Sequence, residues 1–322
     1  MSTTSSTFSP GLEEILREEG AAPRKRGGFL KFLKLIYLQN PLGGFGLTII
    51  LALFVIGVFG PGLDINLPGG TTILHLPRLA PHDKGEFVGA VKENPSLAHP
   101  FGTDGLGRDL FSRVIFGARI SLLVGFISVF AGISIGMVLG MASGYFGGWI
   151  DNLMQRTVDA IIAFPALIWL LIIVRILGPN MQNVILVIAL FIIPTTLRIG
   201  RGAALSEQNN PDIEAARSVG APWYRMLFRH LAPNILPLGI VLATSSLAGA
   251  ILGESALSFL GLGIPPPNPS WGTDISLARN DFPIHIWWPL FPGIAISLTV
   301  LGFNLLGDTI RDIADPRLRG SR

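Results

Sequence analysis

The sequence predicts an all-α integral membrane protein with six transmembrane helices. Hydrophobic residues make up 49% of the 322 residues and charged residues only 14%, whereas a soluble domain carries about 25% charge. Long uncharged apolar runs approach or exceed the roughly 20 residues that a helix needs to cross a bilayer. Glycine and proline recur inside these runs, which membrane helices tolerate better than soluble ones.

Six runs are predicted to cross the membrane. They cover residues 42–59, 120–142, 160–177, 181–197, 231–253 and 286–307. Gly132, Gly136 and Gly140 recur every fourth residue in the second run, so they share one face of its helix. Small residues let a neighbouring helix approach closely, and we expect this face to pack against another helix of the same chain.

Lys and Arg predict which side of the membrane the loops occupy, because they accumulate in cytoplasmic loops. Six spans place both termini on one side. If that side is the cytoplasm, sixteen of the 24 Lys and Arg residues are cytoplasmic: six before the first span, one between the second and third, five over 198–229 and four after the sixth. The net charge of +3 follows from this bias and does not indicate nucleic acid binding.

This topology divides the chain into regions. They are a cytoplasmic tail (1–41), a first transmembrane helix (42–60), an outer loop (61–117), a five-helix core (118–310) containing an inner loop (206–232), and a cytoplasmic tail (311–322). The outer loop is long for a connector. Its residues 64–99 form a turn-rich insert of open role, with short strands expected at 71–76 and 86–91. Trp271, Trp287 and Trp288 are expected to form an aromatic belt at the outer interface.

The inner loop has the pattern of a helix, a turn and a second helix. Pro211 and the acidic Asp212 and Glu214 suit the first turn of a helix, where the helix dipole favours negative charge. Gly220 can adopt the left-handed conformation that ends a helix, and Pro222 prevents the helix from continuing. A structured amphipathic element in a cytoplasmic loop indicates a docking surface for a soluble partner.

This segment resembles the EAA loop of the permeases of binding-protein-dependent ABC importers. That loop has the pattern Glu-Ala-Ala, three residues, Gly and a distant Ile-x-Leu-Pro, which is matched here by Glu214, Ala215, Ala216, Gly220 and Pro233. His230 and Ala232 stand at the Ile and Leu positions, so the second half matches only through its proline. In the family this loop is the coupling helix that binds a groove of the ATPase subunit. The alternative is an interfacial loop that matches by accident.

Further motifs resemble the dipeptide, oligopeptide and nickel branch of these importers. They lie at 101–109, 117–123, 144–148, 163–165, 256–263, 269–272 and 303–308. Because unrelated motifs keep their order, the resemblance is specific. It covers Pro41 and residues 101–318.

The resemblance implies the pore-forming permease subunit of an ABC importer, which moves peptides or a related small solute by ATP-driven alternating access. It implies as partners a second permease subunit, two P-loop ATPase subunits, a solute-binding protein and the lipid bilayer of a bacterial or archaeal inner membrane. The sequence contains no Gly-x4-Gly-Lys-Ser/Thr motif, so the partners are expected to hydrolyse ATP. No catalytic residue, metal ligand or cofactor site is expected on this chain, and the solute is not identified.

Four charged residues have two interpretations each. Asp104, Arg108 and Asp109 either form an outer cap or a contact for the binding protein, or make a self-contained turn that anchors the second span. Glu254, near the outer end of the fifth span, either lines a cavity or forms a structural pair, since an ionisable residue inside a span is a candidate functional site.

Two other functional classes remain open at this stage. A secondary transporter driven by an ion gradient would need polar groups and broken helices near the midplane, and usually an internal repeat. A membrane scaffold would recruit a cytoplasmic partner through the inner loop without transport. The almost uncharged spans and the lack of a clear repeat favour the importer.

Overall fold

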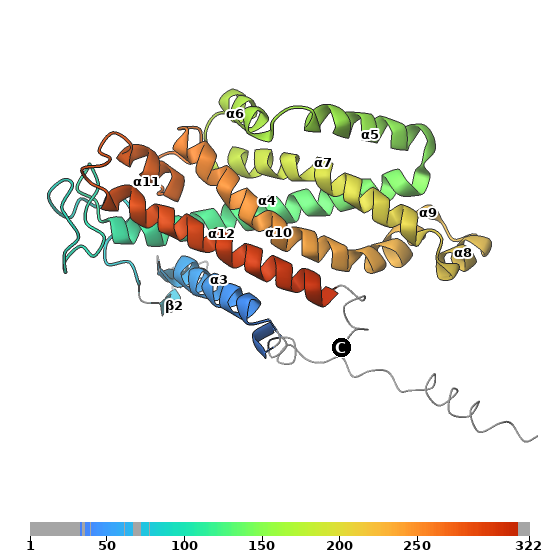
Figure 1. Cartoon of the computed structure of the whole chain (residues 1–322), viewed down its shortest axis with the longest axis horizontal. Coiled ribbons are helices and arrows are strands. Elements are labelled where there is room, and N and C mark those ends of the chain that lie inside the picture. The colour runs from blue at the N-terminus through green and yellow to red at the C-terminus, as the bar shows by residue number, and fades with distance from the viewer. Residues whose placement is uncertain are drawn as a thin grey trace, which may run out of the picture.

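A bundle of long helices makes up most of the protein (Figure 1), which confirms the predicted all-α membrane class. The computed structural model describes residues 33, 36–38, 40–60, 62–66, 72–76 and 78–314, so most of both predicted tails lies outside the described residues. Five helices are long and apolar enough to cross a membrane, and a bent pair makes a sixth crossing if it counts as one span. The five helices are α3 (Pro41–Phe59), α4 (Leu110–Phe146), α7 (Met181–Glu207), α10 (Ala232–Phe259) and α12 (Trp287–Ala314).

The glycine face of α4 packs against α7, as expected. A Cβ atom added at Gly140 would lie 2.4 Å from the carbonyl oxygen of Leu197, and one added at Gly136 would lie 2.7 Å from the Cβ of Thr196. Only glycine allows the two backbones to come this close. The prediction of intramolecular packing is therefore confirmed, and α4 and α7 form the most extensive helix pair among the described elements.

The other long helices surround this pair. α12 packs against both α3 and α10, and α10 also packs against α4 and α7. The contact between α3 and α12 again depends on glycine, because a Cβ at Gly46 would lie 2.8 Å from the carbonyl oxygen of Gly302. In Figure 1, α3 begins and α12 ends toward the side of the bundle that carries α8 (Pro211–Ser218).

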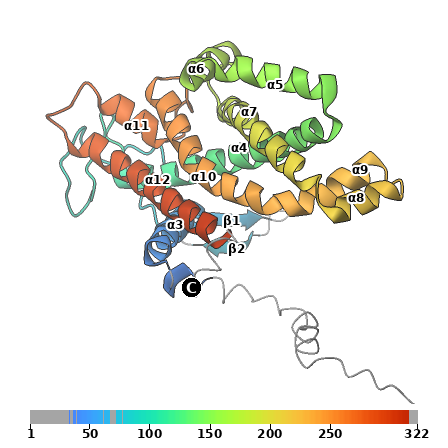
Figure 2. The same ribbon diagram turned by 45° about the vertical axis from the view of Figure 1, so that its right-hand side comes forward.

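The third predicted span, residues 160–177, is wrong as a single straight helix. The chain forms α5 (Gly148–Ile162) and α6 (Ala166–Leu177), which meet at 91° (Figure 2). The bend falls at Pro165, which caps α6 and has no backbone N–H with which α5 could continue. The predicted span also left out the polar start of α5. In the structure this part is held to α7, because Asp151 forms an ion pair with Arg201 at 2.5 Å.

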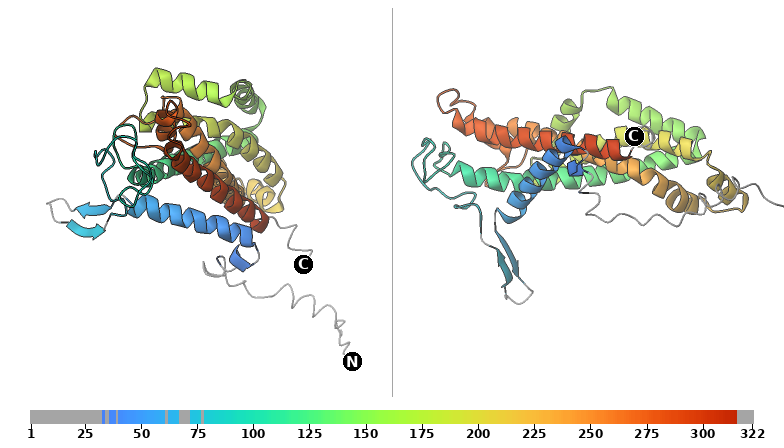
Figure 3. Two further views of the ribbon diagram at one scale, coloured as in Figure 1. Left: turned by 60° about the vertical axis from the view of Figure 1, so that its left-hand side comes forward. Right: turned by 60° about the horizontal axis from the view of Figure 1, so that its bottom comes forward.

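The outer loop contains a small antiparallel hairpin that projects from the bundle (Figure 3), formed by β1 (Leu63–Asn66) and β2 (Thr72–Leu76). β2 confirms the expected strand at 71–76. Residues 86–91 form no strand, and Phe87 makes only an isolated bridge with Arg108. The irregular part of the loop ends earlier than residue 117, because α4 begins at Leu110.

The predicted aromatic belt is wrong for two of its three tryptophans. Trp271, the first residue of α11 (Trp271–Ala278), is fully buried, and its indole Nε1 donates a hydrogen bond to the carbonyl oxygen of Val114 at 2.9 Å. Gly117 makes room for this indole ring on α4. Trp288 is buried beside Leu110. Both rings therefore join the outer loop region to the bundle instead of facing lipid.

Replacing Gly140 by alanine should weaken the α4–α7 pair, because overpacking a close contact costs about 1–3 kcal/mol. The matched control is Gly202→Ala on α7, where no described atom lies within 4 Å of the added Cβ. Thermal unfolding of the purified protein in detergent should have a lower midpoint for Gly140→Ala and an unchanged one for Gly202→Ala. Equal midpoints would contradict the close contact.

Candidate functional site

The inner loop has the predicted helix, turn and second helix. α8 ends at Ser218, Gly220 has a φ of +74°, and Pro222 caps the short helix α9 (Trp223–Arg225). The N–H of Ala221 donates to the carbonyl of Ala216 at 3.1 Å, and the N–H of Gly220 donates to the carbonyl of Arg217 at 3.0 Å. This pair of bonds is the Schellman motif, which fixes the direction in which the chain leaves a helix.

α8 has an inner and an outer face. Ile213 is only 2% exposed and belongs to the hydrophobic core, and Ala216 packs partly against the same core. Glu214, Ala215 and Gly220 are exposed. Four apolar side chains nearby also face outward, which are Val219, Trp223, Tyr224 and Phe228. An exposed, largely apolar surface beside an exposed carboxylate is suited to binding another protein.

The C-terminal end of α4 supports this element. The guanidinium of Arg217 lies 5.9 Å from the ring centre of Tyr145, and the ring of Trp223 lies 5.8 Å from that of Phe146. Gln208 donates a hydrogen bond from Nε2 to the carbonyl of Gly144 at 2.9 Å. The turn is therefore attached to the helix that runs from this end of the bundle to the outer loop.

Glu207 connects the loop to α10, which the sequence did not predict. Its Oε2 accepts hydrogen bonds from Asn210 at 2.5 Å and from Asn234 at 3.0 Å. One carboxylate thus joins the end of α7, the start of α8 and the first part of α10.

The second half of the loop is continuous with a membrane helix. α9, the π-helical segment η1 (Met226–Leu231) and α10 together form one helix from Trp223 to Phe259. A π-helical turn is rare and frequently marks a functional site. Pro233 lies in the first part of α10 and is exposed. Glu214, Ala215, Ala216 and Gly220 therefore share one structural unit, and Pro233 belongs to the helix that follows it.

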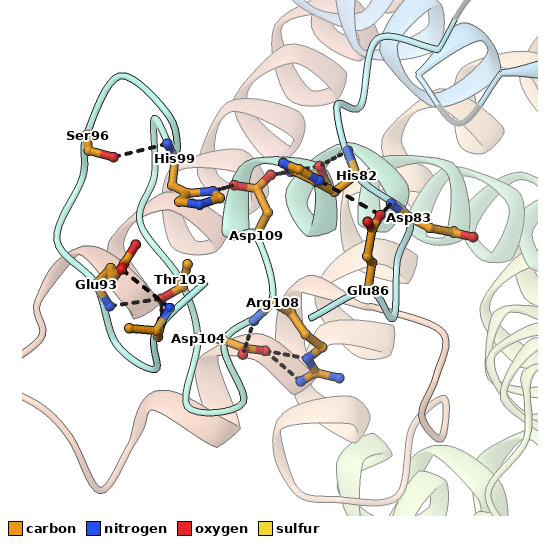
Figure 4. Close-up of polar contacts among 12 residues, drawn as sticks. His82, Asp83, Glu86, Glu93, Ser96, His99, Thr103, Asp104, Arg108 and Asp109 are labelled. Carbon is orange, nitrogen blue, oxygen red and sulfur yellow. Dashed lines mark hydrogen bonds and ion pairs between the residues drawn. The ribbon is translucent and has the colours of Figure 1, made fainter. Parts of the chain in front are cut away.

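At the outer end, Asp104 and Arg108 make a closed turn (Figure 4). Arg108 donates from Nε to Oδ2 of Asp104 at 2.6 Å, and Oδ1 of Asp104 accepts from the backbone N–H groups of Leu106 at 2.8 Å and Arg108 at 3.0 Å. Both side chains are buried. This geometry corresponds to the self-contained turn, and a role for these residues in an outer cap stays a prediction.

Asp109 caps the N-terminus of α4. Its Oδ2 accepts hydrogen bonds from the backbone N–H of Ser112 at 2.8 Å and from the Ser112 hydroxyl at 2.7 Å. Its Oδ1 lies 3.1 Å from Nδ1 of the buried His99 (Figure 4). A capped helix start is more stable by about 1 kcal/mol, so Asp109 anchors α4 to the loop before it.

A second buried ion pair was not predicted from the sequence. Arg113 on α4 bonds to Oδ1 of Asp274 on α11, and its Nε lies 3.7 Å from Oδ2 of Asp104. Complete burial raises the pKa of Asp274, and the adjacent Arg113 guanidinium opposes that rise. No local pattern marks this pair, because its members are 161 positions apart.

Glu254 is fully buried among serines. Its carboxylate accepts hydrogen bonds from Ser258 at 2.7 Å, Ser121 at 3.1 Å and Ser255 at 3.5 Å. Ser121 belongs to α4, so these bonds connect α4 with α10. The geometry corresponds to structural pairing, and a role in lining a pathway stays a prediction. Among the residues that the structure describes, no group of three or more His, Asp or Glu is placed to hold a metal ion.

Comparison with known proteins places these features in context. Residues 132–320 match the family model described as binding-protein-dependent transport system inner membrane component. The chain is 44% identical over 244 residues to a glutathione transport system permease protein, GsiD, of Escherichia coli O157:H7, which covers 75% of this chain and 80% of that protein. The GsiD protein of Pectobacterium atrosepticum is 42% identical over 243 residues, covering 75% of this chain and 81% of its own length.

Removing Arg113 should destabilise the protein strongly, because it leaves the Asp274 carboxylate buried without its partner. Breaking a buried pair in this way costs about 3–5 kcal/mol. Lys92→Met is the control, because Lys92 and Asp281 form a partly exposed pair whose loss should cost at most about 1 kcal/mol. The midpoint of thermal unfolding should be much lower for Arg113→Met than for Lys92→Met. Adding Asp274→Asn to Arg113→Met should recover part of the loss, and no recovery would show that packing dominates.

Proposed function

This chain belongs to the inner-membrane permease components of binding-protein-dependent ABC importers, and we propose that α8 is the surface through which an ATPase subunit drives it. In this family the membrane component is a permease, ATP hydrolysis belongs to separate subunits, and a binding protein supplies the solute. The protein is accordingly a multi-pass inner-membrane protein and not an ATPase.

One observation carries the proposal: α8 is exposed on one face and rigidly supported on the other. A surface that transmits force must move as a unit. The Schellman motif fixes its turn, and Ile213 fixes its inner face. Arg217 of α8 contacts Tyr145 of α4, and Trp223 of α9 contacts Phe146 of α4. Movement of α8 would therefore be passed to α4 and, through Glu207 and the continuous helix, to α10.

We propose the following assembly and orientation. Two permease subunits, this chain and a copy or a different chain, bind two P-loop ATPases on the α8 side and one solute-binding protein on the outer-loop side. Both termini lie in the cytoplasm of a bacterium or archaeon. The cations near α8, Arg217, Arg225 and Arg229, support this orientation because positive loops stay inside. ATP-driven alternating access then exposes a central path to each side in turn.

The solute is proposed to be a small peptide-like molecule. The relatives named above are permeases of glutathione, a tripeptide, and the resemblance to the dipeptide and oligopeptide branch agrees with that class. Selection among such solutes is expected to depend mainly on the binding protein.

Co-purification tests the proposal. The tagged full-length chain, extracted in mild detergent, should bring down P-loop ATPases and a second six-span protein, and the reconstituted complex should need both ATP and the binding protein for uptake. An ion-gradient carrier would instead transport alone in liposomes. A scaffold would bind a cytoplasmic partner without any uptake. Either outcome would overturn the proposed function.

Charge reversal at Glu214 should weaken recovery of the ATPase, because this exposed carboxylate is a suitable partner for a basic group. Asp212→Lys is the control, since both residues are acidic in the first turn of α8 and both are exposed. We expect Glu214→Lys to lower ATPase recovery several-fold more than Asp212→Lys. Unchanged recovery with Glu214→Lys would restrict Glu214 to a local role in the helix.

Gly220→Val should uncouple ATP hydrolysis from uptake. No described atom lies within 4 Å of a Cβ at this position, so the substitution acts through the backbone and not through a clash. A β-branched residue at positive φ is strained by about 1–3 kcal/mol, and we expect uptake to fall by about tenfold. Gly220→Asn is the matched control, because Asn tolerates the left-handed region. Uptake by Gly220→Val at the wild-type rate and membrane level would refute the coupling role.

A further inference from the structure

We propose that a cavity between α6, α7 and α10 is this chain's part of the solute path, and that it contacts the solute through free hydroxyl groups instead of charges. The proposal rests on the importer function above, and it adds the residues and the chemistry of recognition. The cavity measures about 310 Å³, which is near the lower end of the range for small-molecule sites, about 300–1,000 Å³. α6 packs against α7, and both adjoin α10 (Figure 2).

First, three hydroxyl groups on the cavity wall are not bonded to the described part of the protein. Thr195 and Thr196 on α7 and Ser246 on α10 line the cavity, and their hydroxyls form no hydrogen bond with any described residue. Thr196 as a whole is only 3% exposed, but its hydroxyl is not among the fully buried polar atoms that lack a partner, so it lies at the cavity surface. A bound solute or water would supply the hydrogen bond that this hydroxyl lacks within the described part of the protein.

Several other hydroxyls in the membrane helices are bonded within their own helix. In helices, Ser and Thr commonly bond to the carbonyl three or four residues back. Thr244 and Ser245, just before Ser246, both bond to the carbonyl of Val241, at 2.9 and 3.1 Å. Thr299 on α12 bonds to the carbonyl of Ala295 at 2.6 Å. The three cavity hydroxyls are thus available to a ligand, whereas these three are already used within their own helices.

The second observation concerns two glycines on the same wall. Gly249 and Gly253 line the cavity, and a Cβ added at either one would meet no described atom within 4 Å. The glycines of α4, such as Gly140, are required by close helix contact. Gly249 and Gly253 have no such packing reason, and their effect is to keep the cavity wide.

The lining also determines the kind of solute. Its thirteen residues include no Asp, Glu, Lys, Arg or His, so a solute with net charge would find no compensating charge there. Hydroxyls both donate and accept hydrogen bonds, which suits amide groups. The cavity therefore suits a small neutral or zwitterionic solute rich in amides, such as a short peptide whose charges cancel.

A second cavity of the chain has, among the described residues, a single free hydroxyl and no glycine with open space. It lies between α4 and α10, measures about 330 Å³ and is lined by apolar side chains apart from Ser134. A wall of this kind is suited to an acyl chain or to an apolar helix. The group of three hydroxyls and the two open glycines thus distinguish the proposed path from an ordinary lipid-facing groove.

Single-cysteine labelling tests the proposal without knowledge of the solute. The chain contains no cysteine, so each introduced thiol is the only one in this subunit. In the purified complete transporter, a small charged thiosulfonate should modify Thr195→Cys and Ser246→Cys in at least one nucleotide state, because an open solute path contains water that keeps the reagent hydrated. Ser245→Cys is the matched control, because Ser245 faces Gly307 of α12. We expect its modification to be at least about tenfold slower, because a charged reagent does not enter apolar surroundings.

Two labelling results would overturn the proposal. Modification of Ser246→Cys only by a lipophilic maleimide would show that the cavity faces lipid, and no modification by either reagent would show that a partner helix fills it. Co-purified ATPase in the same sample keeps these outcomes separate from a failure of the importer function.

Transport of a labelled peptide by the same complex gives an independent check. Gly249→Leu should reduce uptake at least severalfold by filling the cavity, with ATPase activity retained. Gly293→Leu is the control, because Gly293 on α12 also has open space and lies outside the cavity. Equal uptake by the two variants would contradict the assignment of the path.

Discussion

The close contact between α4 and α7 is the constraint on which the rest of the structure depends. Lipid tails are as apolar as the helices, so membrane helices associate through packing and not through exclusion from water. Glycines at every fourth position let the α4 backbone come against α7. Because α4 runs from the outer loop to the inner turn, its position fixes where both ends of the protein lie. Asp109 caps the start of α4 next to the outer loop. At the other end of α4, the rings of Tyr145 and Phe146 contact the inner turn.

The two ends of the bundle differ in chemistry. At the outer end, charged residues are buried and paired with one another, as Asp104 is with Arg108 and Arg113 is with Asp274. Such pairs are hard to separate, because each partner would be left as an isolated charge in a dry environment. At the inner end, α8 presents its carboxylate and its apolar side chains to the surroundings. These charged groups of the outer end are therefore satisfied within the protein, whereas those of α8 stay exposed.

Features encoded by neighbouring residues were predictable from the sequence. The turn at Gly220 and Pro222, the number of apolar runs and the glycine face of α4 all follow from local spacing, and the structure contains them. Contacts between distant positions were not predictable. The burial of Trp271 and the partner of Arg113 depend on how α11 folds back onto α4. The bend between α5 and α6 was missed because membrane helices tolerate proline, as α7 and α10 do with their internal prolines, so Pro165 alone did not mark a break.

The unbroken helix from Trp223 to Phe259 has a mechanical consequence. With 37 residues and a rise of about 1.5 Å per residue, it is about 55 Å long. It carries part of the inner turn at one end and the serine-bound Glu254 near the other. A rod of that length converts a small rotation into a large displacement. Tilting it by about 10° about one end moves the other end by roughly 10 Å, given the same rise per residue. A modest rotation at the α8 end is thus enough, by leverage alone, to displace the opposite end of the helix by roughly 10 Å.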